Sequence, residues 1–392
     1  MTNRLYYTDS YRTEFSSAIA ERNGDGTRVY LEETAFYPTS GGQPHDIGTL
    51  GGARVVDVID EGERIAHVLE APLSVNDDMR IPGRVDWARR FDHMQQHTGQ
   101  HLLSAVFEDL FGAKTVSVHF GPDYSTLDLD AETITRSQMV AAEARANEIV
   151  AEARPVTVSF EDAESAIGLR KASDRSGQLR IVSIAELDRS ACGGTHVRST
   201  SEIGAILLRS VERVRKTSRL EFVCGQRAVR RARRDFESLT QIAASLSSAI
   251  DDVASLVTTQ SERLKDAENA RKKLEKEVAG ARARERYEAT SPNAAGVRVI
   301  VVRDASSIDE LRAFAQAALS LPRAAVVGAL ASPPSLFVAA SEDSGLDAGK
   351  LIKEQLAAAG GRGGGSPRIA QGSVADAAQV ERTLTTLLNA IG

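Results

Sequence analysis

The first part of the chain has the hydrophobic pattern of short β-strands. Residues 28–32 and 53–58 alternate or cluster β-branched and aliphatic side chains. Glycine pairs at 41–42 and 51–52 interrupt these runs, as turns between strands do. Short strands at this spacing predict a small β-barrel or a sandwich over residues 1–85.

From about residue 86 the pattern becomes helical. Apolar side chains recur at helical spacing within residues 87–111, and a second helix is predicted from Arg136 to Glu152. Strand-like segments follow or intervene at 115–119, 127–129, 156–160 and 180–184. The mixture predicts an α+β domain over residues 86–225.

The last two parts of the chain differ from each other in pattern. Residues 226–287 hold no proline and one glycine, with apolar residues three or four positions apart. This predicts a helical arm over residues 226–290, as a hairpin or a coiled coil. Residues 291–392 alternate strand and helix patterns and predict a small α/β domain, with a glycine-rich loop at 360–368. The whole chain is therefore expected to be α+β.

Composition narrows the cellular setting. The sequence has no run of about 18 apolar residues, so no membrane-spanning helix is expected. Two cysteines in 392 residues exclude a disulfide framework. Because the N-terminus also lacks an apolar signal core, we expect a cytoplasmic protein.

Positive charge is concentrated in one segment. Residues 209–234 hold ten arginines and lysines against two glutamates, a net charge of +8, within a chain whose formal net charge is −6. The rest of the chain therefore carries −14. Such segregation is typical of a local phosphate-binding patch on an acidic body, although a solvated helix face has the same composition.

Two pairs of metal-ligating residues share a four-residue spacing. His97 and His101 would lie one turn apart on one face of the predicted helix. Cys192 and His196 repeat the spacing across a glycine turn. Thiolate and imidazole are good zinc ligands, so the four residues form a candidate site for one zinc ion per chain. The glutamate of the His-Glu-x-x-His metalloproteases is absent, since Thr98 occupies that position.

A four-ligand zinc site leaves its role open. Four protein ligands are typical of structural zinc, whereas catalytic zinc keeps one position for water or substrate. Either a ligand is displaced, or coordination expands, or zinc holds the substrate while another water attacks.

These segments resemble the editing domain of alanyl-tRNA synthetase and its free-standing AlaX-type relatives. The resemblance covers His97-Thr-Gly-Gln-His101 and Ala191-Cys-Gly-Gly-Thr-His-Val197, with Arg219-Leu-Glu-Phe-Val-Cys-Gly225 and the upstream Thr34–Gln43 segment. The glycine-rich segment 360–368 looks like the terminal domain shared by alanyl-tRNA synthetases and DHH-type phosphoesterases. The longer AlaX form is the most similar arrangement.

The resemblance implies a hydrolase that removes wrongly attached amino acid from tRNA(Ala). Serine is the expected substrate residue, and glycine is a further one, because an alanine-activating pocket discriminates poorly against such close analogues. With no room before the barrel for an aminoacylation domain, we expect deacylation without charging and without ATP.

The same resemblance implies roles for further residues. Thr39 would contact the serine hydroxyl, Gly41 and Gly42 would let the backbone approach the terminal adenosine, and Gln43 would shape the pocket or orient water. Asp46 could orient a zinc-bound histidine. His93 and His119 are open between catalytic and structural roles. The expected tRNA contacts are Arg230, Arg231, Arg233, Arg234, Arg362 and Arg368.

Two alternative functions stay open. One is editing of Ser-tRNA(Thr), because threonine editing domains carry similar histidine and cysteine pairs. Another is a non-catalytic RNA-binding protein with structural zinc. A homodimer formed through the helical arm or the C-terminal domain is compatible with any of these functions.

Overall fold

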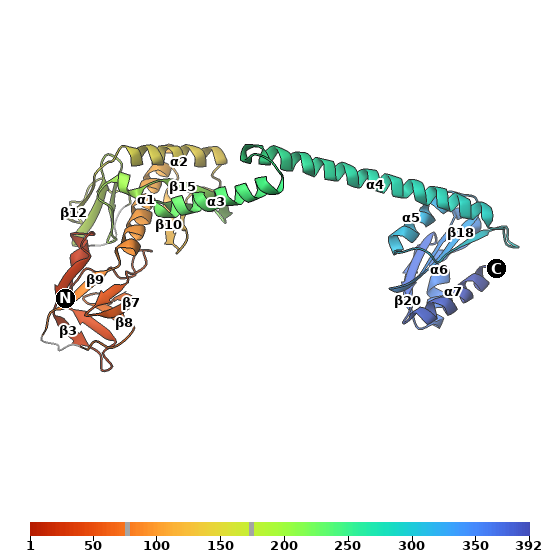
Figure 1. Ribbon diagram of the computed structural model, residues 1–392, viewed down its shortest axis with the longest axis horizontal. Coiled ribbons are helices and arrows are strands. Elements are labelled where there is room, and N and C mark those ends of the chain that lie inside the picture. Colours follow the sequence, from red (N-terminus) through yellow and green to blue (C-terminus); the bar gives the residue numbers. More distant parts are fainter. Residues whose placement is uncertain (75–78, 172–175) are drawn as a thin grey trace. The chain divides into compact units, whose positions relative to one another are not determined.

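The computed structural model describes residues 1–74, 79–171 and 176–392 (Figure 1). The chain forms two compact units, Met1–Ile242 and Ala243–Gly392. Each unit has its own hydrophobic clusters. None of the described helices is long and apolar enough to cross a membrane.

The N-terminal part is a nearly closed barrel, as the strand pattern predicted. Its seven-stranded sheet has the order β2-β9-β6-β7-β8-β4-β3. The edge strands β2 and β3 follow each other in the chain, with one residue, Ala18, between them. The Ala18 carbonyl accepts a hydrogen bond from the Glu32 amide (3.2 Å). The strands are β2 (Glu14–Ser17), β3 (Ile19–Arg22), β4 (Arg28–Leu31), β6 (Gly48–Leu50), β7 (Ala53–Asp60), β8 (Ile65–Leu69) and β9 (Ile81–Val85). A short parallel pair, β1 (Asn3–Arg4) and β5 (Glu33–Thr34), lies outside this sheet.

Helix α1 (Trp87–Phe111) follows the barrel and is the centre of the α+β part. Asp86 caps its start by accepting from the Arg89 amide (3.0 Å), and Gly112 ends it in the left-handed conformation. Two antiparallel sheets accompany it, β10-β11-β16-β15 and β12-β13-β14. The elements are β10 (Thr115–Phe120), β11 (Ser125–Leu129), α2 (Arg136–Ala151), β12 (Val156–Asp162), β13 (Gln178–Ile184), β14 (Asp188–Ala191), β15 (Ile206–Val214) and β16 (Thr217–Cys224).

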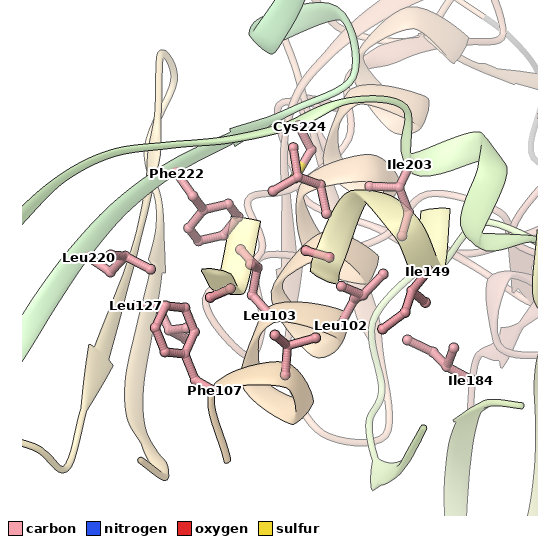
Figure 2. Packing of buried hydrophobic residues seen from close by; sticks show 14 of the residues in the cluster. Leu102, Leu103, Phe107, Leu127, Ile149, Ile184, Ile203, Leu220, Phe222 and Cys224 are labelled. Atoms are coloured by element: carbon pink, nitrogen blue, oxygen red, sulfur yellow. The ribbon is translucent and has the colours of Figure 1, made fainter. Parts of the chain in front are cut away.

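The core forms where α1 meets these sheets (Figure 2). Leu102, Leu103 and Phe107 of α1 are fully buried. They share one cluster with Ile149 of α2 and Phe222 of β16. The helical spacing that predicted α1 therefore marks a real apolar face.

A buried ion pair connects the barrel to α1. The Arg90 guanidinium and the Asp46 carboxylate are both fully buried. Arg90 Nε lies 3.1 Å from each Asp46 carboxylate oxygen, and Nη1 donates to the Ser10 carbonyl at 2.7 Å. Asp46 also accepts from the Tyr37 amide (2.6 Å). A buried charge pair with its remaining hydrogen bonds satisfied holds this junction in one geometry.

The predicted helical arm consists of two helices, α3 (Gln226–Ser245) and α4 (Val253–Ala289). A short 3-10 segment, Ile250–Asp252, precedes α4. The last turns of α4 pack on the C-terminal sheet through Ala283, which is fully buried.

The C-terminal unit is a mixed α/β domain. Its sheet has the order β17-β18-β19-β21-β20, with only β17 and β18 parallel. One hydrophobic cluster contains α5 and the end of α4, and another contains α6 and α7. The elements are β17 (Arg298–Val302), α5 (Ile308–Ala318), β18 (Ala324–Ala331), β19 (Pro334–Ala340), α6 (Ala348–Ala358), β20 (Arg362–Gly365), β21 (Ile369–Ser373) and α7 (Ala377–Ile391).

The glycine-rich segment is an edge strand, where the sequence predicted a loop. Residues 362–365 form β20 and pair with β21. A Cβ atom at Gly363 would lie 2.4 Å from a Leu356 methyl, and one at Gly372 would lie 2.1 Å from the same methyl. The glycines therefore let α6 approach two strands closely, which composition alone does not reveal.

Removing the carboxylate of the buried pair should destabilise the first unit. We expect Asp46→Ala to cost about 3–5 kcal/mol, because Arg90 would stay buried without a counter-charge. Denaturant unfolding followed by the emission of Trp87, the single tryptophan, measures this loss. Glu14→Ala is the control, because the Glu14 side chain is 76% exposed and lies 3.7 Å from Arg84. Equal midpoints for both variants would contradict the role assigned to the pair.

Candidate metal centre

The two predicted ligand pairs meet in the folded chain. His97 and His101 project from α1, and Cys192 and His196 lie on and beyond the turn after β14. Their four ligand atoms all lie within 4.8 Å of one another. The three histidines are buried and Cys192 is half-buried. Residues 95 positions apart in sequence thus form one cluster.

The spacing of the donor atoms fits a tetrahedral ion. Cys192 Sγ lies 3.4 Å from His97 Nε2 and 3.3 Å from His196 Nε2. In a tetrahedral zinc site, bonds of about 2.3 Å to sulfur and about 2.0–2.1 Å to nitrogen place those atoms about 3.6 Å apart. These two sulfur–nitrogen distances are therefore close to those of a tetrahedral zinc site, and the four donors together lie within 4.8 Å of one another.

Each histidine has its other ring nitrogen occupied. His97 Nδ1 bonds the Gln43 Oε1 atom at 2.8 Å. His101 Nδ1 bonds the Asp188 carboxylate at 2.8 Å, and His196 Nδ1 bonds the Thr98 hydroxyl at 3.1 Å. Such partners fix ring orientation and leave the Nε2 atoms for the ion.

The Cys-Gly-Gly turn is shaped by close contact with His97. A Cβ atom at Gly194 would lie 2.1 Å from His97 Cε1 and 2.4 Å from Nδ1. The Gly194 amide also points at the Cys192 sulfur (3.4 Å). On the other side, Arg180 Nη1 donates to the Cys192 carbonyl at 2.6 Å. The glycine therefore allows the thiol and the imidazole to share one small space.

The electrostatics of the cluster favour a thiolate at Cys192 and a neutral ring at His196. Burial raises the pKa of the Cys192 thiol, but the neighbouring His97 and His196 outweigh it and hold that pKa well below its usual value. Burial lowers the pKa of His196 to about 3, so this ring is neutral at pH 7. Metal binding requires deprotonated ligands of this kind.

Asp188 keeps its negative charge despite burial. Burial raises its pKa, but the hydrogen bond from His101 and the ion pair with Arg170 lower the pKa to about 2. Arg170 Nε lies 2.6 Å from Asp188 Oδ1. For His101, burial lowers the pKa, but Asp188 and Cys192 raise it to about 9.

The loop predicted to bind substrate lies next to the cluster. Gln43 is 1% exposed and donates to the Thr195 hydroxyl at 2.8 Å. Thr39, Gly41 and Gly42 are exposed. Gly42 has φ +86°, and a Cβ atom there would lie 3.3 Å from the Val118 carbonyl, so the loop passes close to β10. The Thr39 hydroxyl accepts from the His45 amide at 3.1 Å.

Three further predicted residues lie apart from the ligand atoms. Asp46 meets Arg90 rather than a histidine of the cluster, and Asp188 fills the orienting role that the sequence analysis gave to Asp46. His119 is exposed on β10. His93 is 5% exposed, and burial lowers its pKa to about 4. The His93 ring is therefore uncharged at pH 7.

The predicted basic contacts fall on both units. Arg230, Arg233 and Arg234 are exposed at the start of α3, whereas Arg231 pairs with Asp235 at 2.9 Å. Arg227 is 5% exposed and binds Asp92 of α1 at 2.7 Å, so it holds α3 on α1. In the second unit, Arg362 and Arg368 are exposed.

Comparisons with known proteins identify two domain families along the chain. The family described as "Threonyl and Alanyl tRNA synthetase second additional domain" matches residues 179–220, which include Asp188, Cys192 and His196. The DHHA1 domain family matches residues 296–392. The ligand turn thus belongs to a domain class found in two aminoacyl-tRNA synthetases.

Similar whole proteins narrow the class. The alanyl-tRNA editing protein Aarsd1 of Mus musculus is 35% identical over 293 residues, 69% of each chain. The Bos taurus protein of the same name is 37% identical over 243 residues, and the match spans about half of its length (54%) and 57% of this chain. An alanine–tRNA ligase of Pyrococcus abyssi is 30% identical over 99% of this chain but only 43% of its own length. The chain belongs to the alanyl-tRNA editing protein family.

Removing the partner of His97 should weaken metal binding. We expect Gln43→Ala to lower zinc affinity about 10- to 100-fold, as loss of a residue that orients a ligand typically does. Competition for Zn²⁺ with a chromophoric chelator measures the change. Gln138→Ala removes a glutamine that hydrogen-bonds at the exposed start of α2 and should leave the affinity unchanged. Wild-type affinity in Gln43→Ala would show that this contact does not tune the site.

Proposed function

We propose that this protein is a hydrolase that deacylates mischarged tRNA(Ala), chiefly Ser-tRNA(Ala) and also Gly-tRNA(Ala). The observation that carries the proposal is the cluster of His97, His101, Cys192 and His196, with ligand atoms within 4.8 Å of one another. Relatives named for alanyl-tRNA editing and for alanine–tRNA ligation support tRNA as the partner. One zinc ion per chain is the proposed occupant.

The donor set favours zinc. Zinc takes cysteine and histidine ligands, whereas magnesium and calcium take oxygen ligands. When bound, zinc would polarise the ester carbonyl and stabilise negative charge developing on it. Cys192 is half-buried, whereas the three histidines are buried, so the cluster is least covered at the thiol. Substrate would therefore approach from the side of the Cys-Gly-Gly turn and the Thr39–Gln43 loop.

Residues of the chain would supply positioning and selectivity. Gln43 and Asp188 hold His97 and His101 in place. The hydroxyl of Thr39, on the exposed loop, would form a hydrogen bond with the serine hydroxyl. Alanine could not make this bond, whose net contribution is about 0.5–1.5 kcal/mol. Arg230, Arg233 and Arg234, together with Arg362 and Arg368, would meet phosphates.

Editing of Ser-tRNA(Thr) is the second candidate function. One specific observation favours it: the matched domain family is named for threonyl as well as alanyl tRNA synthetase. The similar whole proteins carry only alanyl names, and this supports the first proposal over the second.

Deacylation of a panel of mischarged tRNAs tests the substrate. We expect faster cleavage of Ser-tRNA(Ala) than of Ser-tRNA(Thr), with correctly charged Ala-tRNA(Ala) largely spared. Incubation with a chelator should abolish the activity, and added Zn²⁺ should restore it. Faster cleavage of Ser-tRNA(Thr) would reverse the assignment, and full activity without metal would remove zinc from the reaction.

The two cysteines provide a matched test of the ligand role. Cys192→Ala should lose zinc and lower the deacylation rate at least about 100-fold, the scale of a lost electrostatic stabilisation. Cys224→Ala is the control, because that thiol is fully buried in the core cluster and burial raises its pKa. A folded Cys192→Ala protein that lacks zinc yet deacylates at the wild-type rate would leave only a structural metal.

Thr39 provides the test of selectivity. We expect Thr39→Val to slow Ser-tRNA(Ala) cleavage by about 2- to 12-fold, the range of one hydrogen bond of about 0.5–1.5 kcal/mol, with less change for Gly-tRNA(Ala). Ser40→Ala alters the neighbouring exposed hydroxyl and serves as the control. Equal slowing of both substrates by Thr39→Val would assign Thr39 to loop structure instead.

A further inference from the structure

Two hollows adjoin each other beside the first turns of α1. Their volumes are about 400 and 70 Å³, and both are lined by Pro122, Arg227 and Arg230. The larger hollow also contains Trp87 and His93 of α1. All of these residues belong to the first unit. Because they share these three lining residues, the two hollows lie side by side, and together they are called the depression below.

The larger hollow presents an aromatic surface. The Trp87 ring packs in a tilted arrangement against two neighbouring rings. Its centroid lies 5.1 Å from that of Phe91 and 5.3 Å from that of Tyr11. These neighbours hold the indole in place while 40% of the residue stays exposed. A fixed, partly exposed indole is a stacking platform for a flat ring, and nucleobases of any sequence can stack on it.

The same hollow contains buried polar groups that lack partners. His93 and Gln95 are each 5% exposed and line it. The His93 Nδ1 and Gln95 Oε1 atoms have no hydrogen-bond partner among the described residues. Buried polar atoms are rarely left unpaired. These two atoms give the wall of the hollow unsatisfied hydrogen-bonding capacity next to the indole.

The smaller hollow is lined by guanidinium groups. Arg230 and Arg234 line it and form no ion pair with a described residue. Arg209 is neutralised by Glu221 at 3.1 Å and Arg231 by Asp235 at 2.9 Å. Asp123 is the remaining acidic residue of the lining. Two unpaired guanidinium groups next to a stacking ring match the phosphate and base of one nucleotide.

We propose that this depression binds an unpaired nucleotide of the tRNA 3′ end. The base would stack on Trp87 in the larger hollow, and its phosphates would meet Arg230 and Arg234. The proposal rests on the proposed function, which makes tRNA the partner. His93 precedes the ligand His97 by one helical turn, about 6 Å along the axis, so the bound nucleotide would lie near the acylated end.

Trp87 makes the test direct, because it is the only tryptophan in the chain. Uncharged tRNA(Ala) is titrated into the zinc-loaded full-length protein while Trp87 emission and the anisotropy of labelled tRNA are recorded together. We expect emission to fall in step with binding. The same tRNA without its unpaired 3′ nucleotides should bind more weakly and leave the emission largely unchanged.

Variants separate the two halves of the depression. Trp87→Ala should weaken tRNA binding by roughly 5- to 150-fold, the range of one lost base–aromatic stack, and Trp87→Phe should lose less. Arg230→Gln and Arg234→Gln should each weaken binding and reduce the slope of log affinity against log salt by about one. Arg136→Gln is the control, because Arg136 is exposed at the start of α2, outside both hollows. The arginine variants test the site even if Trp87→Ala does not fold.

The outcomes distinguish this proposal from the proposed function. If tRNA binds to saturation without any change in Trp87 emission, or if the truncated tRNA quenches equally, the depression does not bind the 3′ end. Active deacylation in that case would leave the editing function standing. Absence of deacylation with every mischarged tRNA would overturn the function itself, whatever the emission shows.

Discussion

A helix that is buried on nearly all sides yet carries polar residues through its centre constrains the whole first unit. From His93 to Phe107 every residue of α1 is buried, including three histidines and three glutamines. Each of these side chains needs a partner, because an unpaired buried polar group costs free energy. Gln96 bonds both the amide and the carbonyl of Cys224, at 2.9 and 3.1 Å. His97 and His101 bond Gln43 and Asp188. The strands and turns around α1 supply the partners of Gln96, His97 and His101, whereas His93 Nδ1 and Gln95 Oε1 have no partner among the described residues.

Much of the fold follows from local sequence. The apolar spacing predicted α1 at the residues where it forms, and it predicted α2 to within one residue, with a capping box of Thr135 and Gln138 marking its start. The four candidate ligands were also predictable as a set, because the repeated spacing of histidine and cysteine is a local signal. These features depend on residues a few positions apart, and a single sequence contains that information.

The hydrogen-bond partners of the candidate ligands were harder to predict from the sequence. Gln43 was singled out as a pocket residue, but its hydrogen bond to His97 spans 54 positions. No sequence signal marked Asp188 as a histidine partner beyond its place four residues before Cys192. Asp46 was predicted to orient a histidine of the cluster, but its partner is Arg90, a buried arginine that the spacing did not mark. Such contacts depend on how barrel and helix dock. In the second unit, the glycines that were expected in a loop lie in β20. They occur in a strand because close packing of α6 leaves no room for a Cβ atom there.

The contact between Gln43 and His97 couples the ordering of the barrel loop to the binding of the ion. Gln43 belongs to a loop of the barrel, while the ion would bind mainly to α1 and the turn after β14. Thermodynamic linkage is reciprocal, so whatever loosens that loop must weaken the grip on the ion, and loss of the ion must loosen the loop by the same free energy. Occupancy of the metal centre would thus be sensed at the loop through which an acylated RNA end would enter.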